Sequence, residues 1–301
     1  GPPGGGLMFT VAEIEGLPTG KLAEMRRLLG VGWMASESID FEMALFVLGH
    51  PTVKKAAKQY KRTQKWRAQI GADAIREAVR SGDLSEAQFP CSGAIQQACP
   101  HSLSHLGTRC RDGSPLGVTR VGLADLQRLA SSVKLEHFQT YMIYVFESRL
   151  WLLERMSRAC GSLRQFVDVH DLTLKKGLMQ TFGVHLEYLR WWVKGLMPHY
   201  PEQVRRVILV NTPPLFAAAW YPARLMLSQR TKSKVTLVES SRAAGVLSQE
   251  VEQRELPQFL GGGGTGLMSS KEQFEHRFLR CDLTEGEVND PEASSSPERL
   301  Q

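Results

Sequence analysis

Three cysteines and two histidines lie close together in the chain and carry groups that could bind a metal ion. They are Cys91, Cys99, His101, His105 and Cys110. Thiolate and imidazole are the usual ligands of tetrahedral zinc. Their order is C-x7-C-x-H-x3-H-x4-C, which lacks the paired C-x2-C spacing of zinc-binding motifs. We therefore expect residues 91–110 to form a loop without a metal, and we expect no cofactor.

Patterns that carry catalysis are missing from the sequence. It has no G-x-S-x-G, no P-loop, no H-E-x-x-H and no G-x-G-x-x-G after a predicted strand. The four glycines at 261–264 follow the predicted sheet without a helix after them, so we interpret them as a linker. His185 lies on the apolar face of a predicted helix, which is typical of a core histidine. The sequence therefore predicts a protein that is not an enzyme.

Residues 199–240 have the pattern strand, turn, helix, basic turn, strand. Short apolar runs at Val207–Val210 and Val235–Val238 predict two buried strands, and Asn-Thr-Pro-Pro after the first predicts a turn. Between the strands, residues 215–227 form a predicted helix that is apolar on nearly every side. Such a helix is deeply buried or covers something apolar outside its own core. The basic residues of the second turn are Arg230, Lys232 and Lys234.

The rest of the chain alternates predicted helices with two further strands. Strands are predicted at 116–121 and 165–170. Residues 89–116 are predicted to be a loop. Helices are predicted within 11–29, at 40–49 with Asp40 as its cap, from Pro51 to about residue 71, and at 72–88, 123–129, 135–160 and 175–196.

The helix that begins near Pro51 has one strongly basic face, opposite an apolar one. A charged face on a surface helix is usually only solvated, but it could also face a membrane or a lipid headgroup, and the sequence leaves both interpretations open. The basic residues are Lys54, Lys55, Lys58, Lys61, Arg62 and Lys65, and the opposite face carries Val53, Ala56, Ala57, Tyr60 and Gln64.

Composition places the chain among soluble globular proteins. It has 301 residues, is 42% hydrophobic and contains no apolar run near the ~18 residues that span a bilayer. The Gly/Pro-rich start lacks the features of a secretory signal, and we expect residues 1–8 to be a disordered remnant of an expression tag. Five irregularly spaced cysteines favour a reducing compartment. The net charge of +6 suits an anionic partner such as nucleic acid or an acidic membrane.

Several motifs resemble the CRAL-TRIO lipid-binding domain, and within it the secretory-pathway phosphatidylinositol/phosphatidylcholine transfer proteins. The longest is YPEQVRRVILVNTP, followed by a Trp-containing helix and T-x-S-K before a strand, and its spacing from Asn211 to Lys234 matches that family without a gap. Residues 44–50 depart from the family, which usually carries basic residues there. Shorter matches are K-W-R at 65–67, F-E-S at 146–148, S-R-A-C-G at 157–161 and L-P-Q-F-L-G-G at 256–262.

This resemblance implies an α/β CRAL-TRIO fold, in which an N-terminal helical lobe adjoins a mixed β-sheet. The sheet would form the floor of an apolar pocket for one lipid, covered by a gate helix at residues 214–228. The expected organisation is a helical lobe with linker at 9–110, the CRAL-TRIO domain at 111–264 and a largely mobile tail at 265–301. Gate and pocket residues are expected at Phe216, Ala218, Trp220, Leu225 and Met226.

The resemblance also implies a set of lipid-headgroup ligands. Arg67, Glu202, Thr231 and Lys234 match the family residues that hold phosphatidylinositol, whereas Gln203 replaces a family arginine. Lys and Arg would bind phosphate, Thr would donate a hydrogen bond, and Glu would orient the lysine. Glu202 and Lys234 could instead be only an ion pair at strand ends. Residues 166–168 lack the hydroxyls of phosphatidylcholine binders, which favours phosphatidylinositol or a different lipid.

The implied function is non-catalytic binding and transfer of a phospholipid, most specifically phosphatidylinositol, between membranes. We expect a cytoplasmic monomer that associates transiently with membrane surfaces and does not bind nucleic acid. Two alternatives stay open. One is a carrier of another hydrophobic molecule, such as a sterol-, squalene- or tocopherol-like ligand, and the other is a protein-interaction scaffold on the same fold.

Overall fold

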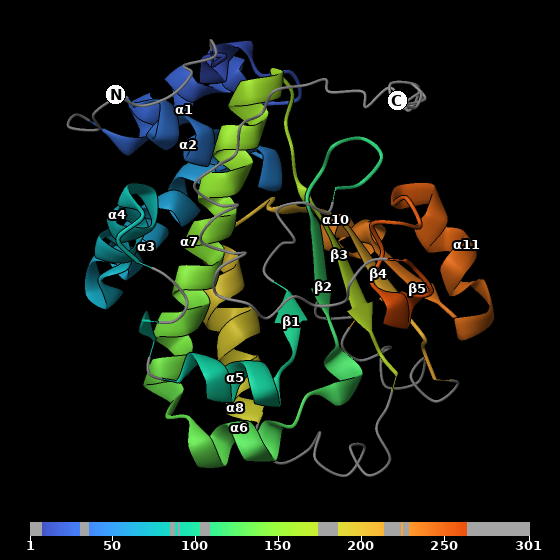
Figure 1. Cartoon of the computed structure of the whole chain (residues 1–301). Helices are drawn as coiled ribbons and strands as arrows, with labels where there is room; N and C mark the ends of the chain where they lie inside the picture. Colours follow the sequence, from blue (N-terminus) through green and yellow to red (C-terminus); the bar gives the residue numbers. More distant parts are fainter. Residues whose placement is uncertain are drawn as a thin grey trace, which may run out of the picture.

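The computed structural model describes residues 8–30, 36–84, 88–89, 91–102, 109–173, 186–213, 224 and 229–263. Helix α7 runs along the molecule between the N-terminal helices and the sheet, and α11 lies on the far side of the sheet (Figure 1). The helices are α1 (Leu22–Leu29), α2 (Glu37–Gly49), α3 (Val53–Ile70), α4 (Ala72–Ser81), α5 (Ser92–Ala98), α6 (Leu126–Ser132), α7 (Leu135–Cys160), α8 (Leu186–Trp191), α10 (Gln229–Lys234) and α11 (Ser240–Glu250).

The sheet is mixed, as expected, and its strand order β1-β2-β3-β4-β5 follows the order of the chain. β1 pairs with β2 in antiparallel fashion, and each of the other neighbouring pairs is parallel. Parallel strands need long crossover connections, which is why α7 separates β2 from β3. The strands are β1 (His101–Ser102), β2 (Leu116–Thr119), β3 (Phe166–Asp171), β4 (Val204–Val210) and β5 (Val235–Val238).

The two faces of the sheet differ in what covers them. One face is apolar and buried against α11, because Val169, Ile208 and Val238 pack there with Leu247 of that helix. Since side chains alternate along a strand, the register of β3, β4 and β5 places the intervening residues on the other face. We call this the second face, and its residues are Asp168, His170, Val207, Leu209, Val235 and Leu237.

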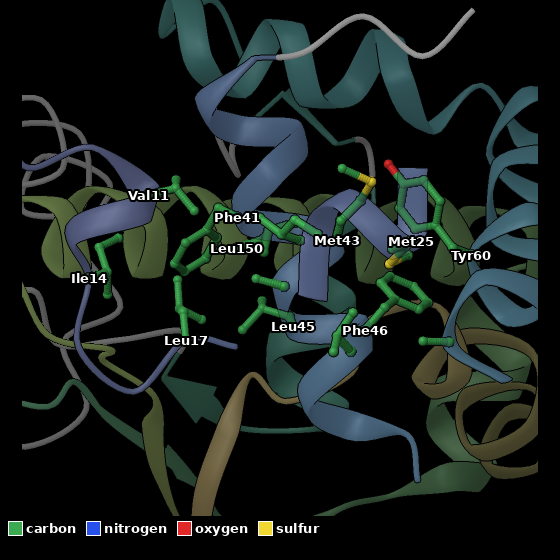
Figure 2. Packing of buried hydrophobic residues seen from close by; sticks show 14 of the residues in the cluster. Val11, Ile14, Leu17, Met25, Phe41, Met43, Leu45, Phe46, Tyr60 and Leu150 are labelled. Atoms are coloured by element: carbon green, nitrogen blue, oxygen red, sulfur yellow. The ribbon is translucent and has the colours of Figure 1, made fainter. Parts of the chain in front are cut away.

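The N-terminal helices have a separate core against α7. Figure 2 shows part of this core, and its labelled side chains come from the first 60 residues and from Leu150 of α7. Leu152, Leu153 and Met156 of α7 and Phe166 of β3 also belong to it. Phe41, Phe46 and Met43 of α2 are fully buried in it, and Tyr60 of α3 meets Phe46 edge to face at 5.1 Å between ring centroids. This core fixes α2 and α3 against the long helix.

Side-chain caps set the starts of α2 and α3. The hydroxyl of Ser36 accepts a hydrogen bond from the Ile39 N–H, so α2 starts earlier than predicted, and the assignment of Asp40 as its cap was wrong. Asp40 lies inside the first turn and forms an ion pair with Arg26. Thr52 caps α3 in the same way. That helix therefore begins two residues after Pro51.

Other boundaries were predicted with mixed success. The limits of α7 and β5 are confirmed, and Gly161 ends α7 with a left-handed φ of 68°. The loop predicted at 89–116 instead contains α5 and β1. Helix α6 begins at Leu126 rather than at residue 123, since Asp125 caps it. Of the helix predicted at 175–196, only 186–196 is described, ending in a π-helical turn at Trp192–Leu196.

Candidate functional site

A cluster of charged side chains joins the start of β4 to the end of α10. Lys234 donates from Nζ to Glu202 Oε2 at 2.8 Å and to the Val204 carbonyl at 2.7 Å. Arg230 donates from Nε and Nη2 to the same carboxylate at 2.6 and 2.9 Å. Gln165 donates to the Glu202 carbonyl at 2.6 Å. Glu202 is therefore the centre of this cluster.

Glu202 has a lowered carboxyl pKa and also an uncommon backbone conformation. Burial alone would raise the pKa of this carboxyl, but hydrogen bonds from Arg230 and Lys234 outweigh it and bring the pKa below its usual value. Its φ of 59° lies in the left-handed region, which is unusual for a residue other than glycine. Such a conformation persists only where the surrounding contacts enforce it, and it clusters at functional sites.

Thr231 belongs to the same cluster by position. It is half-buried on α10, one turn before Lys234. Gly49, the last residue of α2, lies against the other side, because a Cβ added there would be 3.3 Å from Glu202 Cγ. The structure therefore brings three of the four predicted headgroup ligands together, Glu202, Thr231 and Lys234, at the junction with the N-terminal helices.

Arg67, the fourth predicted ligand, lies in a different cluster. Its side chain is fully buried in α3, where the guanidinium donates to Glu147 of α7 and to Asp73 of α4. Neither of these carboxylates contacts Glu202 in the described part of the chain. Glu147 is the middle residue of the F-E-S motif, and that match was the one sequence signal that could have identified its importance.

The buried carboxylate of Glu147 accepts hydrogen bonds from three other segments of the chain. Besides Arg67, it accepts hydrogen bonds from Arg76 Nε at 2.8 Å and from Tyr200 Oη at 2.6 Å. Arg76 also donates to Glu42 of α2 at 2.9 Å. Burial would raise the pKa of Glu147, but the charges of Arg76 and Arg67 hold it below the usual value. This network joins α2, α3 and α4 to α7 and to the segment that leads into Glu202.

His199 provides a second link between α3 and that segment. Its ring stacks on Trp66 with 4.0 Å between centroids, and its Nδ1 lies 2.9 Å from Thr63 Oγ1. Burial, assisted by the positive charge of Arg67, lowers the pKa of His199 from 6.5 to about 4. The imidazole is therefore neutral at physiological pH.

This neutral histidine predicts a pH-dependent stability. In the unfolded chain His199 takes up a proton near pH 6.5, whereas in the folded protein it does so only near pH 4. The contribution of neutral His199 to the stability of the fold is complete above pH 6.5 and is lost as the pH falls towards 4. When the pH is lowered from 6.5 to 5, the free energy of unfolding of the native protein should fall because of His199. In a His199→Phe variant, which keeps the stacking, we expect this fall to be smaller by roughly 1–2 kcal/mol. Urea unfolding at both pH values measures this, and equal losses would contradict it.

The second face of the sheet carries polar side chains at β3. Arg149 of α7 donates from Nη2 to both oxygens of Asp168 at 2.8 and 2.9 Å and lies 3.8 Å above the Phe166 ring. Gly117 of β2 makes room for this carboxylate, because a Cβ there would be 2.3 Å from Asp168 Oδ1. Burial lowers the pKa of the neighbouring His170, whose Nδ1 has no hydrogen-bond partner among the described residues. At this position the sheet therefore offers carboxylate, guanidinium and imidazole groups rather than hydroxyls.

At β4 and β5 the second face is apolar and incompletely covered. Val207 and Val235 are half-buried, and Leu237 is 37% exposed. On the α11 side, Ile208 and Val238 are buried and Thr236 is half-buried. The predicted gate and pocket residues Phe216, Ala218, Trp220, Leu225 and Met226 lie outside the described residues.

The metal-site candidates are only partly described, since His105 lies outside the described residues. Cys91, Cys99 and Cys110 are not in disulfides, and Cys91 Sγ lies 3.4 Å from His137 Nδ1. Within the described ranges, no three His, Cys, Asp or Glu residues are grouped as a metal would require. In the same part of the chain, no helix combines the length and hydrophobicity needed to cross a bilayer.

Comparisons with known proteins connect this geometry to a family. The family model described as CRAL/TRIO domain matches residues 106–262. A protein from Anopheles gambiae called protein real-time is 22% identical over 261 residues, and phosphatidylinositol/phosphatidylcholine transfer protein SFH9 from Arabidopsis thaliana is 24% identical over 249. These alignments cover 84% and 80% of this chain but 36% and 38% of the relatives, so the chain spans little more than a third of their length.

A relative of similar size and a solved structure agree with that match. The SEC14 cytosolic factor of Kluyveromyces lactis is 24% identical over 262 residues, which cover 86% of this chain and 83% of the relative. The crystal structure of Sfh5 superimposes with a TM-score of 0.51 at 14% identity, covering 78% of this chain and 80% of that one, and therefore supports the fold alone. Because the family model spans more than half of the sequence, this chain belongs to the CRAL/TRIO domain family.

Proposed function

We propose that this protein binds a single phospholipid and transfers it between membranes without catalysis, and that phosphatidylinositol is the preferred cargo. The observation that carries the proposal is the second face of the sheet. Partly exposed Val207, Val235 and Leu237 lie on strands that begin beside the charged cluster of Glu202 and Lys234. An apolar floor next to the Lys234 cation suits a molecule with acyl chains and an anionic headgroup.

The charged cluster supplies the groups that a phosphoinositol headgroup needs. Lys234 has three N–H donors, and among the described residues two of them are used by Glu202 and Val204, which leaves the third for a phosphate oxygen. Thr231 would add a hydroxyl on the same helix, and Glu202 would accept from inositol hydroxyls. Arg67 is fully buried, and its guanidinium already donates to Glu147 and Asp73. We therefore propose Glu202, Thr231 and Lys234 as the headgroup site and Arg67 as part of its supporting framework.

The names of the relatives support the same class of cargo. The matching proteins include one named as a phosphatidylinositol/phosphatidylcholine transfer protein and one named as a cytosolic factor. We extend this to the present chain as a proposal of cytoplasmic location, monomeric state and peripheral, transient membrane contact. Phosphatidylinositol is favoured over phosphatidylcholine because β3 lacks the hydroxyls of phosphatidylcholine binders at residues 166–168. Asp168 stands there instead and is already paired with Arg149.

A carrier of another hydrophobic ligand is the second candidate function. It is favoured by the polar groups on the second face, since the unpartnered Nδ1 of buried His170 could bind a hydroxyl that an acyl chain lacks. The two functions differ in the role of Lys234. A sterol-like cargo would not need this cation, so a Lys234→Ala variant with an undiminished ligand load would favour the second candidate.

Lipid retention tests the proposed function directly. We expect the purified protein to carry one phospholipid per chain, as measured by native mass spectrometry and lipid extraction. Leu237→Glu should remove most of that load, because it places a charge on the apolar floor. Leu28→Glu is the matched control, since Leu28 is similarly exposed at 36% but lies on α1. Protein without lipid, or equal loads in both variants, would contradict the proposal.

A further inference from the structure

Helix α3 concentrates the positive charge of the whole chain. It contains seven lysines and arginines and no carboxylate, whereas the net charge of all 301 residues is +6. Arg67 is buried in the network around Glu147, and the other six cations are exposed. We call these six the α3 basic face, and they are Lys54, Lys55, Lys58, Lys61, Arg62 and Lys65. Helical spacing places them within one arc of about 120°.

The α3 basic face is not neutralised by the described parts of the chain. None of its six residues forms a salt bridge with a described carboxylate. Lys61 donates from Nζ to the Leu28 carbonyl at 2.9 Å, which satisfies an acceptor at the end of α1 but leaves the charge uncompensated. Helix α3 lies on the side of α7 away from α11, so it is far from the sheet face that α11 covers (Figure 1).

Intrahelical electrostatics make this arrangement unfavourable for the helix itself. Lys54 and Lys55 lie in the first turn, where the helix dipole favours acidic residues instead. Lys54 and Lys58, and likewise Lys61 and Lys65, are like-charged neighbours four residues apart, which repel each other. The stability of α3 therefore does not account for its basic residues, and a partner outside the described parts of the chain would.

The packing of α3 means that a partner can contact only its charged side chains. The apolar face of α3 is used inside the protein, where Val53, Ala56 and Tyr60 are buried. The helix therefore cannot insert that face into a bilayer, and only its lysine and arginine heads reach outward. Five of the six are lysines, which act as point charges and lack the planar fork with which arginine recognises single phosphates or base edges. Such a row suits a broad, fluid anionic surface.

We propose that the α3 basic face docks on the anionic phospholipid surface of a membrane, by electrostatic attraction and without insertion. The inference deepens the proposed function, on which it rests, because a lipid carrier has to reach a membrane before it can exchange its cargo. Docking through charge alone should weaken steeply with salt.

Vesicle sedimentation of the full chain tests the proposal. The probes are vesicles of phosphatidylcholine with and without 30 mol% phosphatidylserine, at about 50 and 500 mM salt. The test variant replaces Lys54, Lys58 and Lys65 with glutamine, which has a similar helix propensity. Each lysine near an anionic membrane surface should strengthen binding roughly fivefold. Because the test variant lacks three of them, we expect its binding to phosphatidylserine vesicles to weaken about 100-fold at low salt. The matched control replaces three other exposed cations with glutamine, Arg109, Lys134 and Arg242.

The outcomes separate this inference from its alternatives. The proposal is supported if binding to phosphatidylserine vesicles weakens strongly in the test variant and threefold or less in the control variant. Equal weakening of both variants would mean that net charge alone drives binding, and that would overturn the proposal. Binding to a 20-nucleotide RNA that is tighter than to vesicles and lost in the test variant would also overturn it. Lipid load is measured on the same samples, so native protein without lipid would refute the proposed cargo while leaving the docking result intact.

Discussion

Replacing Glu147 with alanine is expected to lower the free energy of unfolding by about 3–5 kcal/mol. The carboxylate is 1% exposed and is the shared acceptor for Arg67, Arg76 and Tyr200. Removing it leaves the fully buried guanidinium of Arg67 with Asp73 as its described counter-ion, and Asp73 is 66% exposed. An uncompensated buried charge is far more costly than a lost surface ion pair. Urea or thermal unfolding followed by circular dichroism measures the change.

An exposed ion pair provides the control for this variant. Glu252 pairs with Arg254 at 2.8 Å, but the two side chains are 44% and 79% exposed. The same glutamate-to-alanine change at Glu252 should alter stability by less than about 0.5 kcal/mol. If Glu147→Ala were no more destabilising than Glu252→Ala, the network would not hold the N-terminal helices to α7. That result would overturn the structural role given to Arg67.

Lys234→Ala is expected to reduce phosphatidylinositol transfer between vesicles about 10- to 100-fold, because hydrogen bonds to charged groups contribute about 1.5–3 kcal/mol each. Its effect on stability should be smaller, about 1 kcal/mol or less, since the side chain is 19% exposed and Glu202 keeps Arg230 as a partner. A fluorescent or radiolabelled transfer assay and a melting curve, run on the same preparation, measure both effects.

Arg230→Ala is the matched control for Lys234. It removes a cation from the same carboxylate, but this side chain is 47% exposed, and Lys234 stays in place. We expect transfer by the Arg230 variant to remain within about threefold of the native protein, as for other exposed ion pairs. If Lys234→Ala lost melting temperature and transfer to the same degree, Lys234 would be a structural ion pair and the headgroup assignment would fail.

Long, regular elements could be predicted from the sequence, because their signals are local. The apolar spacing over residues 135–160 and the glycine after it define α7, and the run at 235–238 defines β5. Start positions were harder where a capping side chain decides them. Ser36 and Thr52 cap their helices, but nearby residues of similar chemistry could have capped them equally well. Asp40, the predicted cap, forms an ion pair with Arg26 instead. α5 was missed because seven residues with few apolar positions give no period to detect.

The charged residues of the site could be identified by type, but their pairing depends on the tertiary fold. Glu202 and Lys234 are 32 residues apart, and their contact at 2.8 Å follows from the parallel pairing of β4 with β5. Arg67 and Glu147 are 80 residues apart, and no spacing rule links α3 to α7 at that distance. An arginine assigned to a headgroup from its motif can therefore be committed to a buried carboxylate.

The order of the strands has a consequence for synthesis of the chain. Each strand of the sheet pairs with the strand that precedes it in the sequence, from β1 to β5. A nascent chain leaving the ribosome can therefore add one strand at a time to an existing edge, without waiting for a later segment to fill a gap. Until β4 and β5 have emerged, β3 presents an open, aggregation-prone edge. A pause in synthesis after β3 has left the ribosome and before β4 has emerged would prolong that exposure.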